Sequence, residues 1–123
     1  MRKKSDFNNR IKYINDLNPD LIISIHQNYY KDSKYNGTQI FYMNNKILSD
    51  YLQEKLNPSR LSKPISNSLY MYNKLKGDIL LIECGFLSNN EDRKKLTDQN
   101  YQKEYSKTLA KYISEYYKNN AWI

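Results

Sequence analysis

The chain has 123 residues and a formal net charge of +7, from 20 Lys and Arg residues against 13 Asp and Glu residues. This length fits one domain with a modest core, so we expect a single domain over residues 1–123. The single Cys excludes an internal disulfide, and the single His excludes any site that needs two imidazoles from this chain. The longest apolar runs, 21–25 and 79–82, are far shorter than the ~20 residues that span a bilayer. Polar residues follow the basic start where a signal peptide would be apolar, so we expect neither a membrane segment nor a signal peptide within this chain.

The positive charge favours an anionic partner without indicating nucleic acid. Only four of the 20 basic residues are Arg, and direct base readout favours the Arg fork. The sequence contains no helix-turn-helix glycine turn, no aromatic RNA-binding box and no zinc module. We therefore expect no nucleic-acid partner, and the basic surface suits anionic polymers such as those of a cell wall.

Apolar spacing in the first third of the chain predicts one helix and two strands. The helix covers residues 6–18, and Pro19 ends it because the residue before a proline is disfavoured in the α region. Its apolar positions at helical spacing are Phe7, Ile11, Ile14 and Leu17 or Asn18. Residues 21–26 form a continuous apolar run, which is typical of a strand covered on both faces in a parallel sheet. A polar loop over 29–37 leads to a second strand at 38–43.

The middle of the chain predicts a helix, a long loop and two further strands. An amphipathic helix covers 45–56. Its apolar stripe consists of Ile47, Leu48, Tyr51, Leu52 and Leu56. Residues 57–68, with two prolines and four serines, form a surface loop. Residues 69–72 are predicted to be a short strand, and 78–83 a second buried strand of the parallel type.

Two helices are predicted to end the chain. Ser88 to Glu91 fits a capping box that opens a short helix to about Leu96. The last helix covers about 100–118. Its apolar stripe consists of Tyr101, Tyr105, Leu109, Tyr112, Ile113 and Tyr116. This order of helices and strands predicts an α/β domain in which helices flank a mixed, mostly parallel sheet.

Two ionisable residues end the most hydrophobic strands, where open α/β sheets bind ligands. They are His26, the only histidine, and Glu83, which follows four apolar residues. Packing does not explain a carboxylate there, because a buried carboxylate needs a partner. Strand alternation places His26 on the same face as Ser24 and points Glu83 away from Cys84. On spacing alone, a hydrogen-bonded or surface role is the alternative for His26, and a structural role is the alternative for Glu83. Cys84 is expected to pack as a small apolar side chain.

Three segments, in this order, carry a resemblance to a known family. They are residues 23–28 (Ile-Ser-Ile-His-Gln-Asn), 36–42 (Asn-Gly-Thr-Gln-Ile-Phe-Tyr) and 81–89 (Leu-Ile-Glu-Cys-Gly-Phe-Leu-Ser-Asn). Arg10 and Asn15 fit the family's preceding helix, and Tyr101 with Gln102 fits its C-terminal helix. Over essentially its whole length the chain resembles the zinc-dependent N-acetylmuramoyl-L-alanine amidases, peptidoglycan hydrolases that include the spore-germination amidases.

The resemblance implies cleavage of the amide between N-acetylmuramic acid and the L-alanine of the stem peptide by zinc-activated water. It implies that His26 is a Zn²⁺ ligand and that Glu83 is the catalytic carboxylate, which moves protons for the water and the leaving amine. Gly85 then lets the backbone turn closely behind Glu83, and the loops over 29–36 and 57–68 border the substrate groove. Peptidoglycan is the expected partner. The cell wall, the extracellular space or the spore envelope is the expected location.

The same resemblance implies that the zinc site is incomplete in this chain. The family's other two ligands, a His and a Glu, belong to an N-terminal strand and helix that precede the resembling segments. We therefore expect an amidase fold that lacks this strand and helix, an N-terminally truncated domain, and weak or no activity of the isolated chain. The alternatives are a non-catalytic remnant that binds the cell wall, a fragment that needs a partner chain to supply the other zinc ligands, and a truncated product without a selected function.

Overall fold

The computed structural model describes residues 2–66 and 69–120, in which helices and strands alternate. The helices are α1 (Arg2–Leu17), α2 (Lys46–Leu56), α3 (Tyr70–Lys74), α4 (Asn90–Leu96) and α5 (Gln99–Asn120). The strands are β1 (Leu21–Asn28), β2 (Gln39–Met43), β3 (Lys63–Pro64) and β4 (Asp78–Phe86). They form a four-stranded sheet in the order β1-β4-β2-β3. Pairs β1–β4 and β2–β3 are parallel and β2–β4 is antiparallel, which confirms the mixed, mostly parallel α/β sheet.

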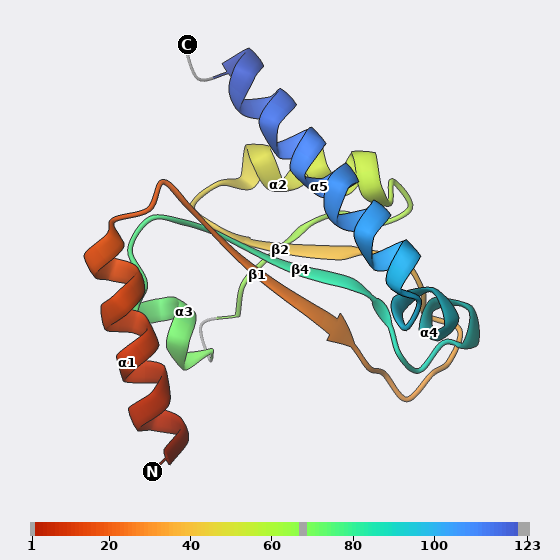
Figure 1. Ribbon diagram of the computed structural model, residues 1–123, viewed down its shortest axis with the longest axis horizontal. Helices are drawn as coiled ribbons and strands as arrows, with labels where there is room; N and C mark the ends of the chain where they lie inside the picture. The colour runs from red at the N-terminus through yellow and green to blue at the C-terminus, as the bar shows by residue number, and fades with distance from the viewer. Residues whose placement is uncertain (1, 67–68, 121–123) are drawn as a thin grey trace.

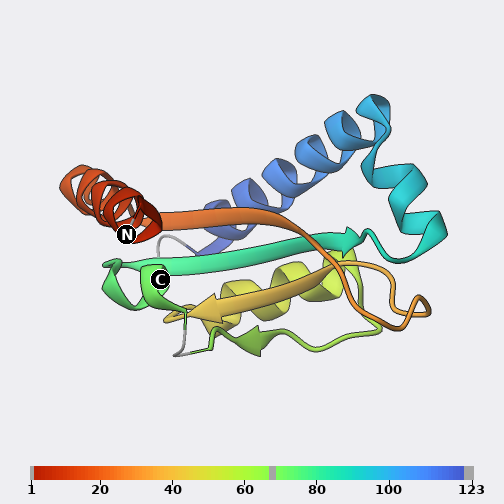
Figure 2. The ribbon, with the colours of Figure 1, turned by 90° about the horizontal axis from the view of Figure 1, so that it is seen from below.

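Helices cover both faces of this sheet. Figure 1 shows α2 and α5 on one face and α1 and α3 on the other, and Figure 2 shows the same layers turned by 90°. Side chains of β4 alternate between the faces, so this strand contributes to both halves of the core. The core on the α2 and α5 side consists of Ile40, Leu48, Leu52, Leu80, Ile82 and Leu109. The core on the α1 and α3 side consists of Ile65, Tyr72, Leu75, Ile79 and Leu81.

The predicted helices are confirmed, and one of the predicted caps is displaced. Asn45 begins α2, and its side chain accepts a hydrogen bond from the Leu48 N–H at 3.0 Å. At α4 the cap is Asn89 rather than Ser88, and the Asn89 side chain accepts from the Asp92 N–H at 3.0 Å. Both caps satisfy a backbone donor that the first helical turn leaves free.

The prediction that residues 21–26 are covered on both faces is wrong. These residues do form β1, but within the described residues β1 is an edge strand that pairs with β4 alone. The side chain of Ile25 is 60% exposed, whereas Ile82, its register partner in β4, is fully buried. A continuous apolar run therefore predicts the strand but does not distinguish a central position from an edge.

The predicted strand at 69–72 is also wrong. Residues 70–74 form the short helix α3, from which Tyr72 and the following Leu75 are buried against the sheet. Tyr72 lies within the helix and Leu75 is the residue that caps its C-terminus, and the packing of both against the sheet overrides the β propensity of the segment.

The loop predicted at 57–68 is confirmed for the most part. It contains the two-residue strand β3, which pairs with Phe41 and Tyr42 of β2. Residues 67 and 68 lie outside the described residues. No helix in the described part of the chain has the length and apolar character needed to cross a membrane.

Candidate functional site

His26 and Glu83 are register partners on the adjacent parallel strands β1 and β4. Paired residues on neighbouring strands share a face of the sheet, so both side chains lie on the face that α1 and α3 cover. Ser24 lies on this face too, two residues before His26. The structure thus brings together the two residues that the sequence singles out, near the carboxyl ends of strands that continue to Asn28 and Phe86.

Glu83 is a half-buried carboxylate with an unsatisfied oxygen. Burial raises its pKa above the ordinary value, and the nearby His26 opposes this shift in part. Its Oε2 atom is buried and, among the described residues, has no hydrogen-bond partner. Native proteins rarely leave a buried acceptor unpaired, and such groups gather at functional sites. A carboxyl group with a raised pKa is suited to taking up and returning a proton.

Two hydroxyl groups hold the imidazole of His26. The Ser24 Oγ atom lies 2.8 Å from Nε2 of His26 and 2.8 Å from the Tyr72 hydroxyl oxygen. The Tyr72 hydroxyl oxygen itself lies 3.4 Å from the same Nε2 atom. This network fixes the orientation of an otherwise exposed ring, and it uses a residue that sequence reasoning missed. No local sequence signal marks Tyr72, because its segment has β propensity and forms a helix through packing.

An irregularity in β4 extends this face beyond Glu83. His26 pairs with Glu83, but Asn28 pairs with Phe86, so β4 contains one more residue than β1 over this stretch. Without the bulge, Glu83 and Phe86 would face opposite sides of the sheet, because they are three residues apart. The bulge lets Phe86 face the same side as Glu83, next to Asn28.

Asp92 of α4 holds the chain segments that follow the site. Its Oδ2 atom accepts hydrogen bonds from the backbone N–H groups of Gly37 at 2.8 Å and Phe86 at 2.9 Å. Gly85 favours this approach, since a Cβ atom there would lie 3.0 Å from Oδ2 of Asp92 and the carboxylate would have to shift. The expectation that Gly85 forms a turn behind Glu83 is therefore corrected, because Gly85 lies within β4.

Cys84 lies on the opposite face from Glu83 and packs, as expected, against the core beneath α2 and α5. Burial raises the pKa of its thiol. A thiol with a raised pKa carries less thiolate and is a weaker nucleophile and metal ligand. Cys84 therefore does not add to the His26 and Glu83 pair.

The described residues do not supply a complete metal site. They contain no group of three or more His, Cys, Asp or Glu side chains placed to hold a metal ion. A catalytic zinc site takes three protein ligands, and here one imidazole lies beside one carboxylate. We therefore assign no catalytic step through a metal to these residues alone.

Comparison with known proteins identifies the family. The family described as N-acetylmuramoyl-L-alanine amidase matches residues 1–115 of the chain. This chain belongs to that amidase family. It is 34% identical to the germination-specific N-acetylmuramoyl-L-alanine amidase of Bacillus subtilis over 94% of this chain and 52% of the relative. It therefore spans about half the length of that amidase.

Solved amidase structures confirm the fold. The CwlD amidase of Clostridioides difficile, solved in complex with the GerS lipoprotein, has a TM-score of 0.78 and 35% identity. The match covers 93% of this chain and 66% of CwlD. The catalytic domain of CwlV, an amidase from Bacillus (Paenibacillus) polymyxa, has a TM-score of 0.75 and 24% identity over 89% of this chain and 64% of that domain. At this lower identity, the likeness to CwlV shows the fold alone.

Proposed function

We propose that this chain acts in the hydrolysis of peptidoglycan, at the amide between N-acetylmuramic acid and the L-alanine of the stem peptide. Membership of the amidase family supports the class of reaction. The observation that carries the proposal is the pairing of His26 with Glu83, whose buried Oε2 atom has no partner among the described residues. An unsatisfied carboxylate oxygen near the end of a strand supports a role for Glu83 in proton exchange with a bound substrate.

In this proposal Glu83 performs the proton transfers of amide hydrolysis. Its carboxylate takes a proton from the attacking water, and the resulting acid returns a proton to the leaving amine. The raised pKa favours this double role, because general acid–base groups work best with pKa values nearer the working pH. Ser24 and Tyr72 hold the imidazole of His26 beside this carboxylate.

We propose that Zn²⁺ binds at this site only when further ligands come from outside the described residues. His26 would be one ligand, and a second His and a Glu would come from another polypeptide segment. The 123 residues by themselves are proposed to hold zinc weakly and to turn over little substrate. Zinc bound stoichiometrically by the purified, tag-free chain in native mass spectrometry would overturn this part of the proposal.

Among the described residues β1 has a neighbouring strand on one side alone, which favours a second version, in which a partner chain completes the site. Ile23 and Ile25 are 38% and 60% exposed on this strand, an apolar surface that a further strand or helix would cover. The two versions share the role of Glu83 and differ only in whether the missing ligands arrive on another chain.

The proposed location is the cell wall or the spore envelope. The Bacillus subtilis relative is described as germination-specific, and the net charge of +7 suits an anionic polymer. A chain that fails to bind insoluble peptidoglycan at physiological salt would contradict this placement.

The experiment that tests the reaction supplies the missing ligands in trans. The chain is co-expressed with an amidase fragment that carries the second His and the Glu, and cleavage of N-acetylmuramoyl peptides is followed by chromatography. We expect cleavage by the pair, and its loss in the Glu83→Gln variant. Glu104→Gln, on the exposed face of α5, is the matched control and should keep the activity.

A further inference from the structure

A cavity of about 270 Å³ lies at the carboxyl ends of β1 and β4, where Asn28 and Phe86 line it. Gln39, the register partner of Glu83 in β2, lines this cavity together with Asn28. We propose that it binds the α-carboxylate of a stem-peptide residue through Arg60 and Lys63, while Gln39 accepts a hydrogen bond from the N–H of that residue. This inference rests on the proposed function, and it names the part of the substrate that this end of the site recognises.

Arg60 is a cation held in place by aromatic rings. Its guanidinium carbon lies 5.1 Å from the ring centroid of Phe86 and 5.6 Å from that of Tyr35. One of its N–H groups donates to the carbonyl oxygen of Asn36 at 3.3 Å. Because the side chain is already ordered, binding an anion costs little further side-chain entropy. A guanidinium presents several donors in a planar fork that matches the two oxygens of a carboxylate.

Neither cation of the cavity is neutralised by an acidic side chain. In the described part of the chain, the ion pairs involve other cations, and neither Arg60 nor Lys63 has an Asp or Glu within ion-pair distance. Two unneutralised cations beside a cavity with aromatic walls attract an anion. They are therefore available to a carboxylate of the substrate.

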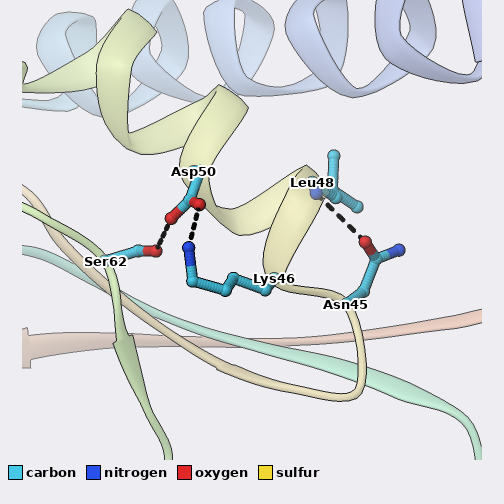
Figure 3. Close-up of polar contacts among 5 residues, drawn as sticks. All are labelled: Asn45, Lys46, Leu48, Asp50 and Ser62. Atoms are coloured by element: carbon cyan, nitrogen blue, oxygen red, sulfur yellow. Dashed lines mark hydrogen bonds and ion pairs between the residues drawn. The ribbon is translucent and has the colours of Figure 1, made fainter.

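The loop that carries both cations is fixed to α2 (Figure 3). Ser62 donates a hydrogen bond to the carboxylate of Asp50, and the Lys46 ammonium lies 2.6 Å from the other oxygen of that carboxylate. The next residue, Lys63, pairs with Phe41 in the sheet. Asp50 thus anchors the loop without reaching Arg60 or Lys63, so the backbone that carries these two residues is held before a ligand binds.

Gln39 supplies the acceptor of the cavity. Its side chain is 97% buried, and its Nε2 atom donates to the carbonyl oxygen of Leu61 at 2.8 Å, which fixes the orientation of the amide. Its Oε1 atom is buried and has no hydrogen-bond partner among the described residues. A buried acceptor without a partner is costly, and either ordered water or a ligand N–H that reaches it can satisfy it. An N–H close to a carboxylate is what an α-amino-acid residue of a peptide offers, and a simple anion lacks it.

The test compares two probes that differ in one group. They are N-acetylmuramoyl-L-alanyl-D-glutamate and the same compound with D-isoglutamine, in which the α-carboxylate is an amide. Each is titrated into the ¹⁵N-labelled 123-residue chain, and the Kd is measured from NMR shifts. We expect the acid to bind roughly tenfold more tightly than the amide, as for the loss of one charge-assisted contact.

Charge-removing variants assign that preference to the cavity. Arg60→Gln and Lys63→Gln should each remove most of the preference, whereas Lys111→Gln, which makes the same change of charge on exposed α5, should keep it. If Arg60→Gln fails to fold, the exposed Lys63→Gln carries the test. Gln39→Leu should weaken the binding of both probes, because both carry the N–H.

Two results overturn the inference, and a third also overturns the proposed function. If the acid and the amide bind with equal affinity and both shift the imidazole signal of His26, the carboxylate site is rejected and the proposed function is not. Displacement of the acid by sodium acetate at equal concentration shows a simple anion site and rejects recognition of the peptide. If neither probe shifts any signal of the chain, the proposed function fails together with the inference.

Discussion

The hydroxyl oxygen of Tyr72 lies 3.4 Å from Nε2 of His26, although 46 residues separate the two in the chain. Ser24 bridges them, with its Oγ atom 2.8 Å from each. The contact exists because α3 packs over the sheet and buries Tyr72 above the end of β1. The position of the imidazole therefore depends on a helix that carries neither of the two candidate catalytic residues.

Removing the Tyr72 hydroxyl should loosen His26. The Tyr72→Phe variant loses a buried hydrogen bond, so we expect a loss of about 1 kcal/mol in the free energy of unfolding. The imidazole ¹⁵N signals should shift, and they are unambiguous because the chain has one histidine. Tyr13→Phe, at a 68% exposed position, is the control. Identical imidazole spectra for wild type and Tyr72→Phe would show that the hydroxyl does not hold the ring.

The pair formed by Ile25 and Ile82 tests the position of β1 at the edge. These residues are register partners, yet Ile25 is 60% exposed and Ile82 is 0% exposed. We expect Ile82→Ala to cost about 2–5 kcal/mol in denaturant unfolding, and Ile25→Ala to cost less than about 1 kcal/mol. Similar losses for the two variants would mean that β1 is covered in solution, for example by a second copy of the chain.

Substitution of Gly85 tests the close approach of α4. A Cβ atom at this position would lie 3.0 Å from the Asp92 carboxylate and 3.2 Å from Leu96 Cδ1. We expect Gly85→Ala to cost about 1–3 kcal/mol by overpacking, measured by thermal or denaturant unfolding. The cost should be smaller in an Asp92→Ala background, where one of the two contacts is gone. Strict additivity of the two substitutions would contradict this explanation.

The stabilising effect of Asp50 should depend on pH. Its hydrogen bonds with Lys46 and then Ser62 lower the pKa of Asp50 below the reference value of 3.8. Between the lowered pKa and 3.8 the unfolded chain binds more protons, so the contribution is complete above about pH 4 and is lost as the pH falls through the lowered pKa. We expect Asp50→Asn to cost about 0.5–1 kcal/mol at pH 6 and less at pH 3. The same loss at both pH values would contradict the charge-based account.

Sequence patterns predicted where the helices and strands lie better than they predicted how buried each of them is. The runs at 21–26 and 78–83 are equally apolar, and both form strands. Their burial differs because β4 has a neighbour on each side, whereas β1 pairs with β4 alone within the described residues. Position in a sheet is a property of the whole topology and is not encoded in the local run of residues.

The candidate site was predictable in part. His26 and Glu83 stand out because a charged or polar residue ends an apolar strand. Tyr72 could not be found in this way, since its segment has β propensity and became a helix only through packing. The proposed roles of Gln39 and Arg60 were also missed. They rest on an oxygen without a hydrogen-bond partner and a cation without an acidic partner among the described residues, which depends on three-dimensional neighbours.

The rate of amide cleavage with and without the Glu83 carboxylate tests the central claim most directly. The chain, combined with a fragment that supplies the other zinc ligands, is assayed on an N-acetylmuramoyl-L-alanyl peptide in wild-type and Glu83→Gln forms. Zinc content and folding are measured in both. Loss of a general acid–base group predicts a kcat lower by a factor of about 10²–10⁴, with zinc content unchanged. An unchanged kcat in a folded Glu83→Gln variant would contradict the assignment of Glu83 as the carboxylate that transfers protons.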